Sequence, residues 1–151
     1  MSGKDSNMFV TKVVTPKGKP VTCGDCVQLQ PHFSFDEKFT SDYLIIPALL
    51  PVPESGVIRD PRVLDYICSQ YSLGTTIASV CTGAFLLAET GLLDGKSATT
   101  NWQFEKKFRY RYPKVNLEIS KILTENDNLI CSGAVSSMMH LALRIIQREG
   151  S

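Results

Sequence analysis

The sequence lacks a long apolar run and carries almost no net charge. No segment reaches the ~20 consecutive apolar residues that a membrane-spanning helix needs. The first seven residues are polar, so we expect neither a membrane anchor nor a signal peptide. The 16 basic and 15 acidic side chains leave a formal charge of +1, so the surface as a whole has no attraction for nucleic acid or an anionic membrane. These shortages predict a cytoplasmic protein without a membrane partner.

Recognisable metal-ligand and redox patterns are also scarce. The five cysteines form an odd count without the spacing of a disulfide scaffold, which predicts reduced thiols. Cys23 and Cys26 form a C-x-x-C, but no second ligand pair for zinc follows them and no strand-to-helix context for a redox site surrounds them. The remaining candidate ligands are scattered: Cys68, Cys131, His32 and His140. We therefore expect no metal and no cofactor, and a simple turn at residues 23–26.

Strand patterns alternate with helix patterns along the chain. A length of 151 residues fits one domain with a sizeable core, so we predict a single domain over residues 1–151. β-branched or alternating runs predict strands at about residues 9–15, 27–30, 43–46, 75–80, 97–99, 115–119, 121–124 and 128–131. Helical spacing and capping residues predict helices at about residues 61–73, from the turn after Cys81 to about 90, at 102–111, and a final helix opened by Ser132 or Gly133.

This alternation predicts an α/β fold, with a mostly parallel sheet that helices cover on both faces. In such sheets the functional crevice lies at the carboxyl ends of the strands. Pro47, Cys81 and Ser132 each fall at a predicted strand end. We therefore expect these residues to line one site although they are far apart in the sequence.

The segment Thr75–Ala88 is central to this arrangement. Its first half is short, β-branched and apolar, whereas its second half contains helix formers, with Cys81, Thr82 and Gly83 between them. Small residues permit a sharp strand-to-helix turn, and the free N–H groups and dipole of the helix start favour an anion such as a thiolate. The alternative interpretation is a buried structural cysteine at the end of a strand, because free cysteine is among the most buried residue types.

Two other patterns concern the helices. Residues 104–112 mix basic and aromatic side chains, as nucleic-acid-binding surfaces do. However, Phe104, Phe108 and Tyr112 recur every fourth residue, which predicts one buried stripe with the basic side chains on the solvated side. The final helix has a predicted apolar face that comprises Met138, Met139, Leu141, Ala142, Ile145 and Ile146.

Three stretches carry a resemblance to a known family. They are residues 78–88 (Ala-Ser-Val-Cys-Thr-Gly-Ala-Phe-Leu-Leu-Ala), 91–96 (Gly-Leu-Leu-Asp-Gly-Lys) and 98–102 (Ala-Thr-Thr-Asn-Trp). Residues 43–47 and 130–134 match further strands of the same family. The chain closely resembles the ThiJ/PfpI group of the class I glutamine amidotransferase-like superfamily. Within that group it is most similar to the N-terminal sensory domain of AraC-family transcriptional regulators.

The resemblance implies a flavodoxin-like three-layer sandwich with Cys81 at a nucleophile elbow. Family enzymes include isocyanide hydratases, amidase- or protease-like members and glyoxalase-like members. Regulators of the AraC type use the domain for ligand sensing and dimerisation, and contact DNA through a separate helix-turn-helix domain. By this likeness the ligand-binding residues are Pro47, Ala48, Cys81, Thr82, Gly83, Asn101 and Ser132.

Three departures from the family pattern bear on activity. Family members begin with a strand and a long helix before the strand matched by Phe9–Thr15, so we expect an N-terminally truncated domain without these elements. Asn101 stands where the family has histidine, and asparagine cannot exchange a proton near neutral pH. Ala48 and Leu49 replace a Gly-Gly pair, which removes the close backbone approach that glycine permits.

We therefore expect the ligand-sensing and dimerisation domain of an AraC-family transcriptional regulator, non-catalytic and without its helix-turn-helix domain. It would bind an unknown small molecule, form a homodimer and reach DNA only through the separate domain. The alternative is a cysteine-dependent hydrolase or hydratase, of the isocyanide hydratase or amidase kind, that uses Cys81. This alternative needs a proton-exchanging partner, and His32 lies in an irregular stretch while His140 is predicted on a helix face.

Overall fold

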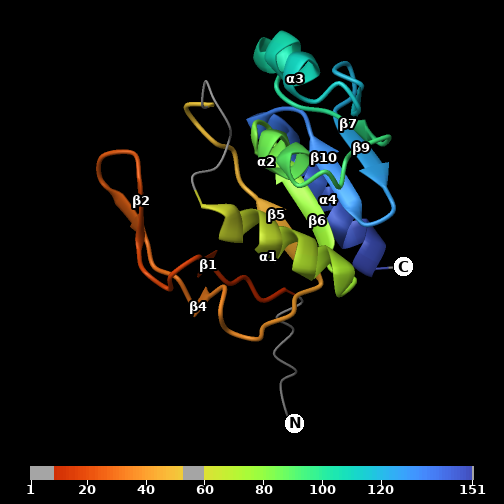
Figure 1. The fold of residues 1–151 in the computed structure, drawn as a ribbon. Coiled ribbons are helices and arrows are strands. Elements are labelled where there is room, and N and C mark those ends of the chain that lie inside the picture. Colours follow the sequence, from red (N-terminus) through yellow and green to blue (C-terminus); the bar gives the residue numbers. More distant parts are fainter. Residues whose placement is uncertain (1–8, 53–59, 151) are drawn as a thin grey trace. The chain divides into compact units, whose positions relative to one another are not determined.

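The computed structural model describes residues 9–52 and 60–150. The chain divides into two compact units, residues 1–39 and 40–151. The polar residues 1–7, where no signal peptide is expected, lie outside the described part. Figure 1 shows the elements of both units, coloured along the sequence.

The first unit contains two pairs of short strands. One pair is parallel (β1 with β4) and the other is an antiparallel hairpin (β2 with β3); the strands are β1 (Val14–Thr15), β2 (Val21–Cys23), β3 (Val27–Leu29) and β4 (Phe33–Ser34). The predicted strand over residues 9–15 is wrong for residues 9–13, because only Val14 and Thr15 find a partner strand. Cys23 and Cys26 lie exposed at the hairpin turn, which confirms the predicted turn.

The second unit is built around a four-stranded sheet. Its order is β5-β6-β10-β9; the strands are β5 (Tyr43–Ile46), β6 (Thr76–Val80), β9 (Leu123–Asn126) and β10 (Leu129–Ser132). β5, β6 and β10 are parallel to their neighbours, and β9 is antiparallel to β10. A separate parallel pair consists of β7 (Ser97–Ala98) and β8 (Asn116–Leu117). β6 and β10 are buried at every position.

Helices cover both faces of this sheet. They are α1 (Pro61–Ser72), α2 (Gly83–Glu89), α3 (Glu105–Arg111) and α4 (Met138–Glu149), with 3-10 turns at Trp102–Phe104 and Val135–Ser137. Figure 1 shows α1 and α2 in front of the sheet and α4 behind it. Ile77 and Phe85 belong to the apolar cluster on the first face, whereas Ala78 and Leu141 belong to the cluster on the second. The predicted flavodoxin-like α/β architecture is confirmed.

β5 is an edge strand of this sheet. Within the described ranges it pairs with β6 alone, and Ile45 is 51% exposed. A continuous apolar run such as Tyr-Leu-Ile-Ile is typical of a strand buried on both faces. At Ile45 this burial is incomplete.

Local sequence signals account for some element boundaries but not for others. Asp60 caps α1, since its carboxylate accepts a hydrogen bond from the Arg62 N–H (3.1 Å), and Pro61 is the first helical residue. The final helix begins at Met138, so the predicted start at Ser132 or Gly133 is wrong. Ser132 is instead the last residue of β10, because the pairing of β10 with β6 extends through it.

An aromatic cluster attaches α3 to α2. The Phe85 ring lies edge-on to three rings, with centroid distances of 6.3 Å to Phe104, 5.0 Å to Phe108 and 6.0 Å to Tyr112. Phe85 and Phe108 are completely buried. The predicted buried stripe is confirmed. Residues 104–112 pack against α2 through their aromatic side chains, and their basic side chains lie around this stripe.

The apolar face of α4 is only partly used inside the unit. Leu141 and Ile145 are buried against the sheet, as predicted. The prediction is wrong for four of the six residues, which are exposed: Met138, Met139, Ala142 and Ile146. Leu143 is also exposed, so that Met139, Leu143 and Ile146 form a second apolar stripe at helical spacing along the outer side of α4.

Candidate functional site

The strand-to-helix turn at Cys81 has an unusual backbone. Cys81 follows the buried strand β6 with a φ of 54°, in the left-handed region that few residues other than glycine adopt. The Cys81 N–H donates to the Ser132 carbonyl (2.8 Å), and the Cys81 carbonyl accepts from the Thr100 hydroxyl (2.9 Å). Such a conformation costs about 1–3 kcal/mol and persists where its surroundings determine it. The predicted sharp turn is therefore present, and it is held by β10 and by the residues after β7.

Gly83 lets β5 and α2 come into close contact. A Cβ atom at this position would lie 2.6 Å from the Pro47 carbonyl oxygen and 2.7 Å from that of Ile46. Both oxygens belong to the backbone at the end of β5, which is hydrogen-bonded to β6. Only glycine fits here, so the sequence Cys-Thr-Gly fixes the helix start against the strand end.

Thr82 ties the segment after β5 to the same turn. Its hydroxyl accepts a hydrogen bond from the Leu49 N–H (2.8 Å) and donates one to the Leu49 carbonyl (2.7 Å). Thr82 is fully buried. The Leu49 N–H is therefore already satisfied by the Thr82 hydroxyl and is not a free donor for an oxyanion in this structure.

The Cys81 thiol has an amide as its neighbour. Its sulfur lies 3.5 Å from Nδ2 of Asn101, and the Cys81 residue is 2% exposed. The Asn101 Oδ1 accepts from the Gln103 N–H (2.9 Å) at the start of the 3-10 turn. This second bond orients the amide, so its NH2 group faces the sulfur. Asn101 can donate a hydrogen bond to the thiol or thiolate, but it cannot remove a proton from it.

The seven predicted ligand-binding residues differ in accessibility. Cys81, Thr82, Gly83 and Ser132 are buried, Ala48 and Asn101 are partly exposed, and Pro47 is exposed. Cys81 contacts Asn101, and Gly83 packs against the backbone of Pro47. The Ser132 hydroxyl donates to the Ser79 carbonyl (3.2 Å) inside the sheet, so it serves the packing of β10 on β6. Sequence reasoning missed Thr100, although it lies in one of the stretches that carry the resemblance.

The remaining thiols and both histidines lie in other settings. Burial raises the pKa of the Cys131 thiol, which is 1% exposed in the sheet interior, and burial also raises the pKa of Cys68. The Nδ1 atom of His32 accepts from the Val13 N–H (3.0 Å) within the first unit. His140 is exposed on α4, as its helix-face prediction required. Over residues 9–52 and 60–150, Asn101 is thus the side chain placed to interact with the Cys81 sulfur.

The described residues contain neither a metal site nor a membrane span. The described part of the chain contains no group of three or more histidine, cysteine, aspartate or glutamate side chains arranged around a metal position. None of the helices between residues 9 and 52 or 60 and 150 combines the length and hydropathy of a transmembrane segment. The candidate site is therefore defined by the Cys81 turn.

The protein is a doubly wound α/β protein, because its parallel sheet lies between helix layers. A cysteine with a left-handed backbone lies between the central strand β6 and the following helix. The candidate site therefore lies at the carboxyl edge of the sheet. The chain belongs to the DJ-1/PfpI family, whose model matches residues 5–148. This confirms the family expected from the sequence.

Individual relatives include enzymes and regulators. Isonitrile hydratase from Pseudomonas putida is 30% identical over 129 residues, which are 85% of this chain and 54% of that protein. The HTH-type transcriptional regulator GbdR from Pseudomonas aeruginosa is 26% identical over 149 residues, 99% of this chain and 39% of that protein. A crystal structure from Vibrio parahaemolyticus, described as a transcriptional regulator protein, has a TM-score of 0.83 and 26% identity, covering 95% of this chain and 75% of that one. The chain thus spans about half or less of the length of these two curated relatives.

Proposed function

We propose that this chain is the ligand-sensing and dimerisation domain of an AraC-type transcriptional regulator and has no catalytic activity. The observation that carries the proposal is the Asn101 amide 3.5 Å from the Cys81 sulfur, where the family pattern has histidine. A relative described as an HTH-type regulator aligns with 99% of this chain, which supports the regulatory assignment. The protein acts in the cytoplasm and reaches DNA through a separate helix-turn-helix domain.

The chemistry at Cys81 supports binding over turnover. Nucleophilic catalysis needs a group that takes the thiol proton and later returns it. The Asn101 amide lacks this capacity, and the Leu49 N–H is committed to Thr82. A ligand would approach past Pro47, Ala48 and Asn101, which are the accessible members of the site, while the buried members Cys81, Thr82, Gly83 and Ser132 fix its shape.

An activity assay with a Cys81→Ala control tests this proposal. The chain is incubated with small isocyanide, nitrile and dicarbonyl substrates, and product formation is followed by mass spectrometry. We expect the native chain and Cys81→Ala to convert substrate at the same background rate, because the site has no proton-exchanging group. Isonitrile hydratase from Pseudomonas putida serves as the positive control for the isocyanide assay. Turnover that Cys81→Ala abolishes would contradict the proposal.

Such turnover would instead support the second candidate, a cysteine-dependent hydratase or hydrolase. Two observations favour it: the left-handed backbone at Cys81, and the 30% identity to an isonitrile hydratase over 85% of this chain. In that case Cys81 would attack the substrate. A group other than Asn101 would accept the thiol proton and later return it.

The outer stripe of α4 supports the dimerisation part of the proposal. Met139, Leu143 and Ile146 are 65%, 57% and 47% exposed and follow one face of the helix. A second copy related by a twofold axis would present the same stripe to the first copy. The two α4 helices would then bury each other's apolar side chains. We therefore place the dimer contact on α4.

Leu143→Glu is expected to weaken the dimer at least about tenfold, because it places a charge in the apolar contact. Sedimentation velocity over a concentration series measures the dissociation constant of native and variant chains. Leu73→Glu is the matched control, since Leu73 is 65% exposed but lies at the end of α1. A native chain that stays monomeric, or a Leu143→Glu dimer as tight as the native one, argues against this contact.

A further inference from the structure

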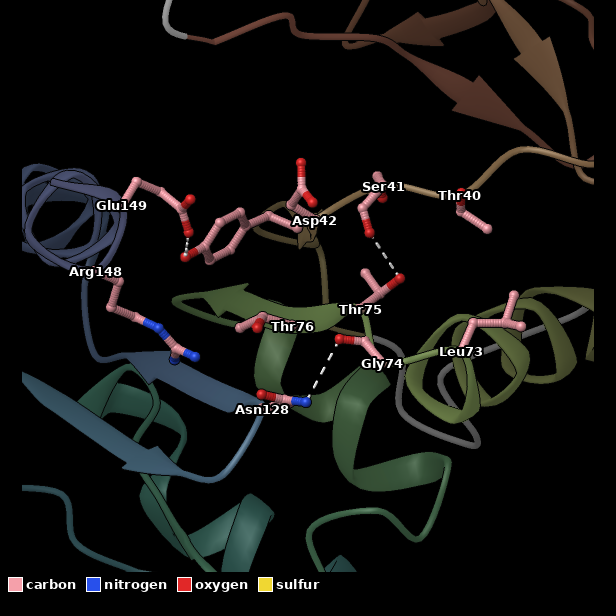
Figure 2. Close-up of a pocket in the computed structure, with 11 residues that line it drawn as sticks. Thr40, Ser41, Asp42, Leu73, Gly74, Thr75, Thr76, Asn128, Arg148 and Glu149 are labelled. Atoms are coloured by element: carbon pink, nitrogen blue, oxygen red, sulfur yellow. Dashed lines mark hydrogen bonds between the residues drawn. The ribbon is translucent and has the colours of Figure 1, made fainter. Parts of the chain in front are cut away.

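A second concave site lies at the other end of the sheet from Cys81. It is a cavity of about 450 Å³ at the amino ends of β5 and β6, bordered by the last turn of α4 (Figure 2). This volume falls in the usual range of small-molecule sites. Its polar lining includes Asp42, Tyr43, Thr76, Asn128, Arg148 and Glu149.

Thr76 provides the observation that points to a ligand. It is the first residue of β6, lines the cavity and is only 5% exposed. Its hydroxyl has no hydrogen-bond partner among the residues that the structure describes, whereas the neighbouring Thr75 hydroxyl donates to the Ser41 carbonyl (2.8 Å). This hydroxyl opens to the cavity, so it can bond to a polar group of a ligand in place of water.

Two carboxylates lie on one side of the cavity. The Tyr43 hydroxyl donates a hydrogen bond to the Glu149 carboxylate (2.7 Å), and this bond joins β5 to the end of α4. Burial, together with the charge of Glu149, raises the pKa of Tyr43 to about 12. Tyr43 is therefore a neutral donor that holds the Glu149 side chain in place. Asp42, the residue before Tyr43, adds a second carboxylate to the lining.

Hydrogen-bond donors also line the cavity. Figure 2 shows the Arg148 guanidinium extending towards Asn128, with Thr76 above Asn128 in this view. One nitrogen of Arg148 contacts Glu125 (3.0 Å), and the guanidinium has further N–H donors. The Asn128 amide makes one long contact to the Gly74 carbonyl (3.5 Å). Arginine, asparagine and threonine side chains are suitable donors for a carboxylate.

We propose that this cavity binds a small zwitterion, with its ammonium group against Asp42 and Glu149 and its carboxylate against Arg148, Asn128 and the Thr76 hydroxyl. Charged side chains of both signs line the cavity, so a molecule with a single charge would pair with only some of them. The site is separate from the Cys81 turn, since it lies at the opposite ends of the same strands. It is therefore independent of whether Cys81 is catalytic.

Calorimetric titration of the full chain with a series of ω-amino acids, from glycine to 6-aminohexanoate, tests the proposal. The series varies the separation of the two charges without changing their chemistry. We expect at least one member to bind, and expect its amine-only and carboxylate-only analogues to bind at least about tenfold more weakly, because each analogue leaves one side of the cavity unpaired. If no member of the series binds, the proposal is wrong.

Two variants with matched controls locate the site. Glu149→Gln and Thr76→Val are each expected to weaken binding about tenfold, since each removes one charge or one hydroxyl at nearly constant size. Glu89→Gln is the control for the first, because Glu89 accepts a hydrogen bond from Tyr112 in the same way but at a different place. Thr124→Val is the control for the second, because Thr124 is a similarly buried threonine in a different strand, β9.

The controls and Cys81→Ala are expected to bind as the native chain does. Circular dichroism shows whether each variant is folded before it is titrated. Binding that both site variants leave unchanged would place the probe elsewhere and overturn the proposal. Binding lost only in Cys81→Ala would assign the probe to the other end of the sheet, which also overturns it.

Discussion

Replacing Phe85 with alanine is expected to lower the free energy of unfolding by about 3–5 kcal/mol. Phe85 is fully buried in α2 and contacts the rings of Phe104, Phe108 and Tyr112. Its removal leaves a cavity where four rings met, and none of them can move in without opening the contact between α2 and α3. Because a domain is stable by about 5–15 kcal/mol in total, this one change removes a large share of the stability.

Urea unfolding followed by circular dichroism measures the effect. Tyr110→Ala is the control, since Tyr110 is an aromatic residue of α3 that is 89% exposed, and it is expected to change the free energy by less than about 0.5 kcal/mol. Equal losses in the two variants would show that the aromatic cluster does not hold α3 in place.

Gly83→Ala is expected to cost about 3 kcal/mol, the upper end of the range for inserting a methyl group into a packed region. The added Cβ would lie 2.6 Å and 2.7 Å from two backbone oxygens of β5, and backbone cannot rotate away as a side chain can. Alanine's better helix propensity, worth about 1 kcal/mol, does not offset this clash. The strain would move the end of β5 away from the Cys81 turn, so ligand binding at that site is expected to fall as well.

Gly150→Ala is a useful comparison for this variant. There the nearest atom to a new Cβ is a helix carbonyl oxygen at 3.2 Å, and the residue is exposed at the end of α4. We expect a loss below about 1 kcal/mol. A Gly83→Ala chain as stable as Gly150→Ala would mean that β5 and α2 adjust easily, contrary to the close packing described above.

Much of the fold follows from local signals in the sequence. The change from β-branched residues to helix formers around Cys81 correctly predicts β6, the turn and α2. Asp60 followed by Pro61 correctly predicts the start of α1. These predictions succeed because strand period, helix period and capping act within a few residues of one another.

Element ends that depend on distant partners were not accessible to the same reasoning. Residues 9–13 have strand composition but no strand to pair with, and Ser132 has the character of a helix start yet completes β10 beside β6. Similarly, the outer residues of α4 have core composition but stay exposed in the part of the chain that the structure describes. Tertiary pairing decides each of these cases, and pattern alone does not contain it.

The candidate site shows the same division. The sequence identifies Cys81 by its turn, but the contact between Cys81 and Asn101, 20 residues apart, came from family resemblance. The two hydrogen bonds between Thr82 and Leu49 depend on how β5 meets α2, and no spacing rule predicts them. The cavity at the opposite edge joins Tyr43 to Glu149 across 106 residues, beyond the reach of any local pattern.

The order of the strands also has a consequence for synthesis on the ribosome. β6 has a strand on each of its edges only when β10 lies beside it, and the bond between Ser79 and Ser132 joins residues 53 positions apart. At about 5–20 residues per second, the nascent chain therefore holds a finished apolar strand with one edge unpaired for roughly 3–10 seconds. During this interval β6 is exposed to other nascent chains, and a ribosome-associated chaperone would have its greatest effect on the yield of this protein then.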